Sequence, residues 1–288
     1  MRFDSRQCNV AVPAALVLAG SLAAFSAEAA LHDRGGGFIY DDVLNVTWTQ
    51  DANLFRTQVT ADANIVDQII SHTPSIADSY WGDADLSSNL FDESGSHFRT
   101  SDGTMTWYGA QAWVNYLNAQ NYAGYNDWRL PVVKPLNGTN FVVGNSSDDV
   151  LTLYNGNADV GWNNGHAQTE LGHLLFGDLG ITGSKDVLGH DTIPSWPNAG
   201  PFTNFGLTNF WTGTKLPDGL DGYAEDQAMF FFGNIGFQGG GEKPFFYFRA
   251  WAVRDGDSAV AAVPLPAGVW LLGTSLMGLL SFRRRQEV

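Results

Sequence analysis

The chain has 288 residues with 30 acidic and 15 basic side chains, and its formal net charge of −15 argues against nucleic acid as a partner, because such a surface repels phosphate groups. Its single cysteine, Cys8, stands near the start, so the rest of the chain has neither disulfides nor thiol chemistry. Stability must therefore come from an apolar core, for which 10 Trp, 9 Tyr and 19 Phe provide the material.

Residues 1–29 have the pattern of a secretory signal peptide. Arg2 and Arg6 give a basic start, and a stretch of apolar and small residues comes next. Ala27 and Ala29 then place small side chains at the two positions that signal peptidase reads, which predicts cleavage after Ala29. The alternative is an uncleaved membrane anchor, for which the apolar stretch is short. Signal peptidase is thus an expected partner, and the domain after the cleavage site is expected to be exported.

The first part of the domain predicts a hairpin, a helix and a long loop. β-rich runs at 38–40 and 46–48 flank turn-forming Asp and Asn residues, as in a β-hairpin. Apolar residues recur at helical spacing over 57–71, and the Ser-, Asp- and Gly-rich stretch 72–103 predicts a loop. Residues 56–103 are therefore interpreted as an insertion in the domain.

The next segment predicts the first of two main helices. Ala110, Trp113, Val114 and Leu117 form one apolar stripe at helical spacing, with Thr106 as the expected N-cap. A proline comes after the segment and forbids its continuation as helix.

The second main helix is predicted over 169–180, and strands dominate the last third of the domain. Strands are expected at 209–214, 227–233 and 245–254, with a Gly-rich turn region at 236–244 between the last two. Helices succeeded by a run of strands indicate an α+β domain with an antiparallel sheet, spanning residues 30–262.

The last 26 residues or so combine three features in a fixed order. These are the motif Val263, Pro264, Leu265, Pro266, Ala267, then a charge-free stretch over 267–282, then Arg283, Arg284 and Arg285. As a helix the stretch would reach about 24 Å, close to the thickness of a bilayer core. The arginines would stay on the cytoplasmic side, which places the domain outside. A buried core helix is the alternative, and the closing arginines argue against it.

This tail resembles the PEP-CTERM class of sorting signals in its VPLPA variant. The resemblance implies recognition by an exosortase, a membrane protease that cuts near the proline-containing motif. It further implies transient insertion of a transmembrane helix in the inner membrane, and then transfer to the cell surface or extracellular matrix of a Gram-negative bacterium. Whether the C-terminal helix is cleaved or retained stays open.

Five blocks of the domain together resemble the Lcl C-terminal domain family, whose function is largely unknown. The blocks are Met105-Thr106-Trp107, Gly124-Tyr125-Asn126-Asp127-Trp128-Arg129-Leu130-Pro131, Glu170-Leu171-Gly172-His173, Phe210-Trp211-Thr212-Gly213-Thr214 and Ala250-Trp251-Ala252-Val253-Arg254. The resemblance implies a C-type-lectin-like fold. It also implies structural roles for Trp107, Asp127, Trp128, Arg129, Pro131, Glu170, Trp211 and Arg254. Formylglycine-generating enzymes share this kind of fold, but the missing cysteine excludes their oxidase chemistry here.

Three tryptophans are the candidate ligand-binding residues. Trp81, Trp162 and Trp196 lie in polar segments rich in Gly, Asn and Pro rather than in periodic core stripes. Tryptophan faces stack on flat apolar surfaces such as those of sugar rings. The alternative is that these side chains anchor long loops to the domain.

A metal cofactor is not expected, and calcium is the remaining candidate. Asp218, Asp221, Glu225 and Asp226 form the densest acidic segment, but their spacing matches no known calcium loop. His166, Glu170 and His173 have a spacing that could bind a transition metal on one helix, although His166 precedes the predicted cap Thr169. We expect no bound metal at either place.

No catalytic residues are assigned. The domain contains no GxSxG, phosphate-binding loop or HExxH motif. The sequence therefore favours a non-enzymatic cell-surface or matrix protein that binds extracellular polysaccharide. A secreted hydrolase of the glycosidase or esterase type is the alternative, because paired carboxylates could act as acid and base.

Overall fold

The computed structural model describes residues 31–143, 154, 156–163, 169–195, 199–206, 208–219, 226–233 and 235–258. The predicted signal cleavage site at Ala27 and Ala29 and the predicted sorting tail, from Val263 to the three arginines ending at Arg285, lie outside these residues. Within the described part of the chain, no helix combines the length and apolarity needed to cross a membrane.

A four-stranded antiparallel sheet joins the two ends of the domain. Its order is β1 (Leu31–Gly35), β2 (Phe38–Asp41), β3 (Val46–Thr49) and β13 (Val253–Asp255). β2 and β3 form the hairpin predicted from the sequence, in full register from Phe38 opposite Thr49. The last strand pairs with β3, so the start and end of the domain are hydrogen-bonded to each other.

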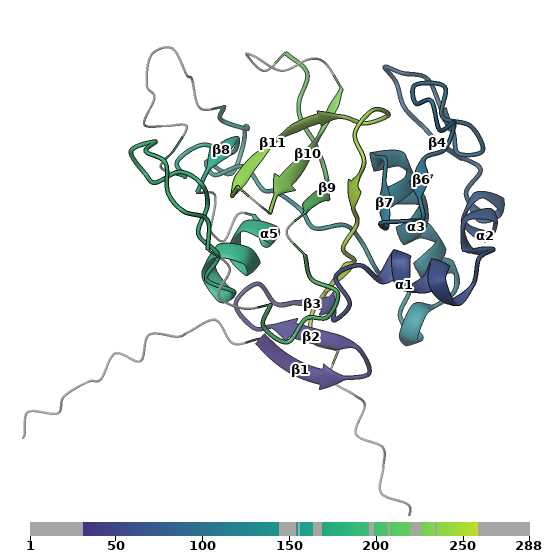
Figure 1. Cartoon of the computed structure of the whole chain (residues 1–288), viewed down its shortest axis with the longest axis horizontal. Helices are drawn as coiled ribbons and strands as arrows, with labels where there is room; N and C mark the ends of the chain where they lie inside the picture. The colour runs from purple at the N-terminus through teal and green to yellow at the C-terminus, as the bar shows by residue number, and fades with distance from the viewer. Residues whose placement is uncertain are drawn as a thin grey trace, which may run out of the picture.

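A second, seven-stranded sheet forms the body of the domain (Figure 1). Its order is β6 (Phe98–Arg99), β7 (Thr104–Met105), β12 (Phe248–Arg249), β9 (Asn209–Lys215), β10 (Gln227–Phe232), β11 (Phe237–Glu242) and β8 (Gly161–Trp162). Its described pairs are antiparallel except the contact of β12 with β9. A short pair, β4 (Ser75–Ile76) and β5 (Ala84–Asp85), stands apart.

The helices lie on two sides of the sheets. Figure 1 shows α1 (Leu54–Ala61), α2 (Ile65–His72) and α3 (Trp107–Ala119) gathered on one side. The hydroxyl of Thr106 accepts the N–H of Gly109 and caps α3 as the sequence predicts. A 3-10 turn, η1 (Tyr122–Gly124), comes after α3. On the other side α5 (Glu170–Gly172) continues directly into a π-helical turn, η2 (His173–Asp178). The domain is therefore α+β with an antiparallel-rich sheet.

Two predicted elements are divided in the structure. The helix predicted over 57–71 is broken between α1 and α2, because Asp62 takes an extended conformation and its carboxylate accepts the N–H of Asn64 at 2.9 Å. The strand predicted over 245–254 is broken between β12 and β13, which belong to different sheets. Buried Trp251 lies at the break, and its ring packs against Trp48 of the first sheet and Phe210 of the second.

Two predicted loops contain strands instead. The stretch 72–103 forms the short strands β4, β5 and β6. The Gly-rich region predicted as a turn contains β11, paired along its length with β10. Aromatic rings explain why glycine suits a strand here: a Cβ on Gly239 would lie 2.4 Å from the ring of Phe237, and one on Gly241 would lie 3.1 Å from Phe230. The glycines make room for rings that cover the backbone.

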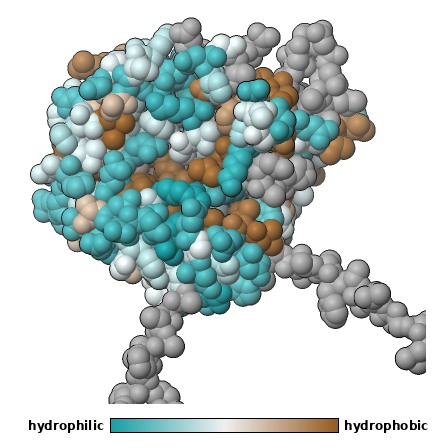
Figure 2. Space-filling model, turned by 180° about the vertical axis from the view of Figure 1, so that it is seen from behind, coloured by the Kyte–Doolittle hydropathy of each residue, from teal (hydrophilic) through white to brown (hydrophobic). Residues whose placement is uncertain are grey.

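The core is rich in aromatic side chains. Trp251, fully buried, has its ring 5.2 Å from that of Trp48, 4.8 Å from that of Phe202 and 5.4 Å from that of Phe210. A second cluster packs the buried face of α3 against α1, α2 and β9. The surface seen from behind is mostly hydrophilic, with several separate hydrophobic areas (Figure 2).

Candidate functional site

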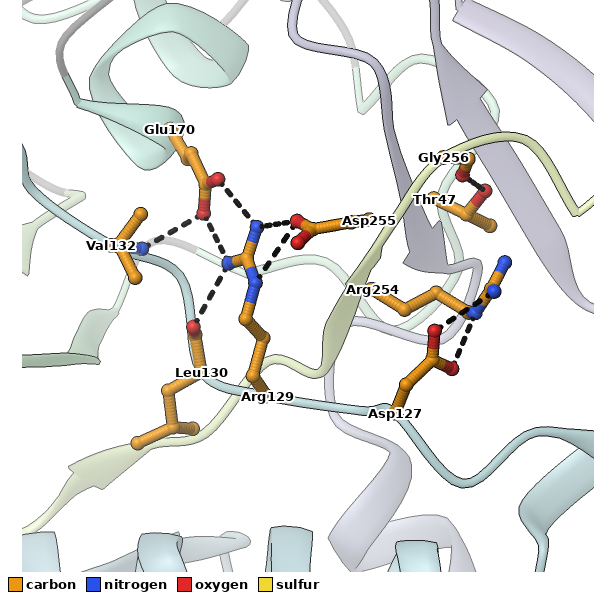
Figure 3. Close-up of polar contacts among 9 residues, drawn as sticks. All are labelled: Thr47, Asp127, Arg129, Leu130, Val132, Glu170, Arg254, Asp255 and Gly256. Atoms are coloured by element: carbon orange, nitrogen blue, oxygen red, sulfur yellow. Dashed lines mark hydrogen bonds and ion pairs between the residues drawn. The ribbon is translucent and has the colours of Figure 1, made fainter.

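Arg129 joins three segments of the chain through charge-assisted hydrogen bonds (Figure 3). Its Nη1 and Nη2 donate to Oε2 and Oε1 of Glu170, both at 2.8 Å, and its Nε donates to Oδ1 of Asp255 at 3.2 Å. Oε2 of Glu170 also accepts the N–H of Val132 at 2.8 Å. Burial lowers the pKa of Arg129, but the two carboxylates outweigh it and raise the pKa above its ordinary value. These residues, the Arg129 network, hold α5 and β13 together.

A second ion pair, between Arg254 and Asp127, lies beside this network (Figure 3). Arg254 donates from Nε and Nη2 to the two carboxylate oxygens of Asp127, at 2.8 and 2.9 Å. These hydrogen bonds hold the pKa of Asp127 below its ordinary value. The Arg254 guanidinium also lies 4.0 Å from the ring centroid of Tyr125. Both arginines thus fasten residues 127–131 to the last strand.

The tryptophans of the family motifs are buried. The ring of Trp128 stacks on that of Phe38 with centroids 5.7 Å apart. Trp107 and Trp211 donate their indole N–H groups to main-chain carbonyls across the sheet, at 2.9 and 2.8 Å. The carbonyl of Pro131 accepts the N–H of a β9 residue at 2.8 Å. The motif residues therefore contribute packing and internal hydrogen bonds.

Exposed aromatic side chains gather around Trp81. This aromatic cluster comprises Tyr80, Trp81, Phe91 and Phe245, with the ring of Trp81 5.0, 5.3 and 5.6 Å from the other three in that order. Trp81 is half-buried, whereas Tyr80, Phe91 and Phe245 are 52%, 45% and 39% exposed. The cluster brings together the stretch 80–91 and the turn after β11. Contiguous exposed rings of this kind mark interaction surfaces.

A small cavity of about 180 Å³ lies beside the aromatic cluster. The polar residues that line it include Asp83, Asp85, Ser88 and Asn89. The indole N–H of Trp81 is buried and has no hydrogen-bond partner. The volume is below that of a pocket for a drug-sized ligand, so the cavity could hold only a small group.

The other two candidate tryptophans are not part of this cluster. Trp162, in β8, packs against Phe237 at 4.5 Å and Tyr154 at 5.0 Å between ring centroids. This packing favours the loop-anchoring interpretation for Trp162. Trp196 lies outside the described residues.

A wider groove of about 630 Å³ lies over α1. Its lining is mainly polar and comprises Asn53, Arg56, Thr57, Thr60, Ala61, Asn204, Phe205 and Arg249. Arg56 is exposed, and its charge together with burial lowers the pKa of Arg249 below its ordinary value, burial being the larger cause. Two arginines and several amides and hydroxyls could bind an anionic ligand.

Asp41, His173 and Asp178 form a buried acid–imidazole cluster that no spacing in the sequence predicts. One ligand atom from each lies within 4.8 Å of the others, and Nε2 of His173 is 3.6 Å from Oδ1 of Asp178. Both carboxylate oxygens of Asp178, whose side chain is 1% exposed, have no hydrogen-bond partner. Burial and the nearby charge of Asp41 raise the pKa of Asp178 to about 7. The three side chains could hold a divalent cation, or the two carboxylates could share a proton.

Only some of the metal-binding candidates named from the sequence lie among the described residues. Asp226 forms an ion pair with Lys243, and Asp218 accepts the main-chain N–H of Asp226 at 2.9 Å. Asp221 and Glu225, like His166, lie outside the described residues. Glu170 forms an ion pair with Arg129, whereas His173 lies beside Asp178.

Comparison with known families matches residues 37–254 to the Lcl C-terminal domain. Comparison with curated proteins gives no match, and neither does comparison with solved structures.

Proposed function

Since the chain belongs to the Lcl C-terminal domain family, we propose that it is an exported, non-enzymatic protein of the cell surface or extracellular matrix that binds extracellular polysaccharide. The domain in this proposal is a C-type-lectin-like one. Export would use signal peptidase at Ala29 and an exosortase at the PEP-CTERM motif, from Val263 to Ala267. The order of motif, apolar stretch and arginines at the C-terminus supports this sorting.

The aromatic cluster around Trp81 is the observation that carries the binding proposal. Tyr80, Phe91 and Phe245 are exposed, and each meets the ring of Trp81 edge to face. Apolar faces of sugar rings stack on such side chains. The exposed residues Asp83 and Asp85 supply carboxylate acceptors for hydroxyl groups next to the stacking surface.

The binding proposal is tested with extracellular polysaccharide isolated from the producing bacterium. The full chain and its variants are run through gels that contain increasing amounts of this polysaccharide, and retardation gives an apparent Kd. Trp81→Ala should weaken binding about tenfold, equal to about 1.4 kcal/mol, while the melting temperature stays near that of the wild type. Trp162→Ala is the matched control, a half-buried tryptophan outside the cluster, and should bind as the wild type.

Other outcomes would replace the proposal. If Arg56→Ala weakens binding and Trp81→Ala does not, the ligand occupies the groove over α1. If the polysaccharide is shortened during incubation, as measured by size-exclusion chromatography, the chain is a secreted hydrolase. Mass spectrometry of the protein from the cell surface tests the sorting: the N-terminus should lie near Ala30, and a C-terminus still at Val288 would contradict the sorting proposal.

A further inference from the structure

Lys243 has a buried, charged side chain whose position hydrophobic packing does not explain. Its side chain is fully buried, which is rare for lysine unless it is paired. Its Nζ lies 2.8 Å from Oδ2 of Asp78 and also contacts Oδ1 of Asp226. The side chains of Asp78 and Asp226 are 0% and 9% exposed. One amine and two carboxyl groups therefore share a site from which water is almost excluded.

Two aromatic side chains and a second lysine lie beside this site. Nζ of Lys243 lies 5.3 Å from the ring centroid of Trp107, and buried Tyr108 is close enough that the charge of Asp78 helps to raise its pKa, after burial itself. Lys215, with its amine 4.0 Å from Asp78, lies at the edge and is about half exposed. A buried ion pair is costly because both charges lose their hydration. A neutral arrangement of the same atoms would remove that cost.

The environment of Asp78 resembles an oxyanion hole. Its Oδ1 accepts the main-chain N–H groups of Tyr80 at 2.9 Å and Trp81 at 3.0 Å, while Oδ2 faces the amine of Lys243. Burial raises the pKa of Asp78, but the hydrogen bonds from Lys243 and from the two N–H groups outweigh it, so the pKa lies below the ordinary value. Two N–H groups on one oxygen can stabilise negative charge that develops there during attack on the carboxyl carbon.

Asp226 is suited to carry protons between the reacting groups. Burial raises its pKa above the ordinary value against the opposing effect of Lys243. Its Oδ2 is buried without a hydrogen-bond partner. Its backbone has φ of +59°, a left-handed conformation that is uncommon outside glycine and that costs energy unless the surroundings maintain it. The carboxyl group is thus held against Lys243 at the start of β10.

We infer that Lys243 and Asp78 condense into an intramolecular amide cross-link, with Asp226 as the proton carrier. The ammonium of Lys243 gives one proton to Asp226, which passes it to Oδ2 of Asp78, and the neutral amine then attacks Cγ of the uncharged carboxyl group to form the N–C bond. A second amine proton reaches the same oxygen through Asp226 as the C–Oδ2 bond breaks, and water departs. The three ammonium protons end as one amide N–H and two hydrogens of water, so no oxidant or other reactant is needed.

The cross-link would have a clear physical effect. It joins residues 165 positions apart in the sequence, in a domain that has no cysteine with which to form a disulfide. Constraining so long a loop reduces the entropy of the unfolded chain, as a disulfide does. The inference does not depend on what the aromatic cluster binds, because only main-chain groups of Tyr80 and Trp81 take part.

The test is the intact mass of the full chain after denaturation. The wild type should be lighter than its processed sequence by about 18 Da, one water, and fragmentation of a digest should give a branched peptide that joins Lys243 to Asp78. Lys243→Met and Asp226→Asn should both show the full mass. Cyclic imides at Asp-Gly sites such as Asp102-Gly103 lose the same mass, but they persist in Lys243→Met and give linear peptides.

The pair Lys185–Asp191 is an internal control in the same digest. Its atoms are 2.6 Å apart, yet Asp191 is 88% exposed, so both groups stay charged in water and should be found in linear peptides. A wild-type protein of full mass would overturn the inference. A branched peptide on Asp226 instead of Asp78, or a cross-link that forms equally in Asp226→Asn, would overturn the roles assigned here.

Discussion

Removing the carboxylate of Glu170 should destabilise the domain far more than removing Asp255, although both bind the same arginine. Glu170 is 9% exposed and makes two hydrogen bonds to Arg129 and one to a main-chain N–H. Asp255 is 79% exposed. Breaking a buried ion pair costs about 3–5 kcal/mol, whereas exposed pairs contribute about 0–1 kcal/mol.

Partial exposure of Arg129 reduces the cost expected for breaking its buried ion pair with Glu170. The side chain of Arg129 is 28% exposed, so water can solvate it in part once Glu170 is gone. We therefore expect Glu170→Ala to lower the free energy of unfolding by about 2–4 kcal/mol, and Asp255→Ala by less than about 1 kcal/mol. Glu170→Gln should fall between them, because it keeps one acceptor and loses the charge.

Urea unfolding, monitored by tryptophan fluorescence and circular dichroism, measures these differences. Coincident curves from the two probes justify a two-state fit, and unchanged slopes show that the midpoints can be compared. If Glu170→Ala costs no more than Asp255→Ala, burial does not determine the strength of the Arg129 network and the reasoning is wrong.

Two further predictions concern the core and the acid–imidazole cluster. Trp128→Ala should cost about 3–5 kcal/mol in unfolding free energy, since it removes a buried indole that stacks on Phe38; a melting temperature within two degrees or so of the wild type would contradict this. The pKa of Asp178 is raised from 3.8 to about 7, so between these pH values the folded state binds more protons than the unfolded state. The contribution of this group to the free energy of unfolding therefore falls as pH rises from about 4 to 7, by at most about 4 kcal/mol. Asp178→Asn should remove that part of the pH dependence and be more stable than the wild type at pH 8; parallel stability curves for the two proteins would refute it.

Local patterns predicted the elements whose residues are adjacent in sequence. The hairpin of β2 and β3 and the cap of α3 by Thr106 are explained by turn residues and spacing alone. The break between β12 and β13 is not, because it depends on Trp251 filling space that other segments enclose. The strand β11 was missed because its glycines are explained by the rings of Phe237, in the same strand, and Phe230, in β10.

The sequence predicted that Arg129 would bind carboxylates, but not which carboxylates. The planar guanidinium of Arg129 suggests several carboxylate partners, but the identity of Glu170 and Asp255 depends on how α5 and β13 approach the segment that contains Arg129. The contacts of Asp178 with His173, and of Lys243 with Asp78, depend on tertiary structure in the same way. No spacing rule in the sequence marks side chains that become neighbours only through the packing of distant elements.

The residues that define the family and those that could bind a ligand are different sets. Trp107, Trp128 and Trp211 are buried, and their indole N–H groups bind main-chain carbonyls, so these side chains have no free face for a ligand. The aromatic cluster lies instead on residues 80–91 and at Phe245, outside the motif blocks. The motifs therefore specify the scaffold and leave the ligand undetermined. A relative that retains the Arg129 network but replaces Trp81 should fold in the same way and bind a different ligand.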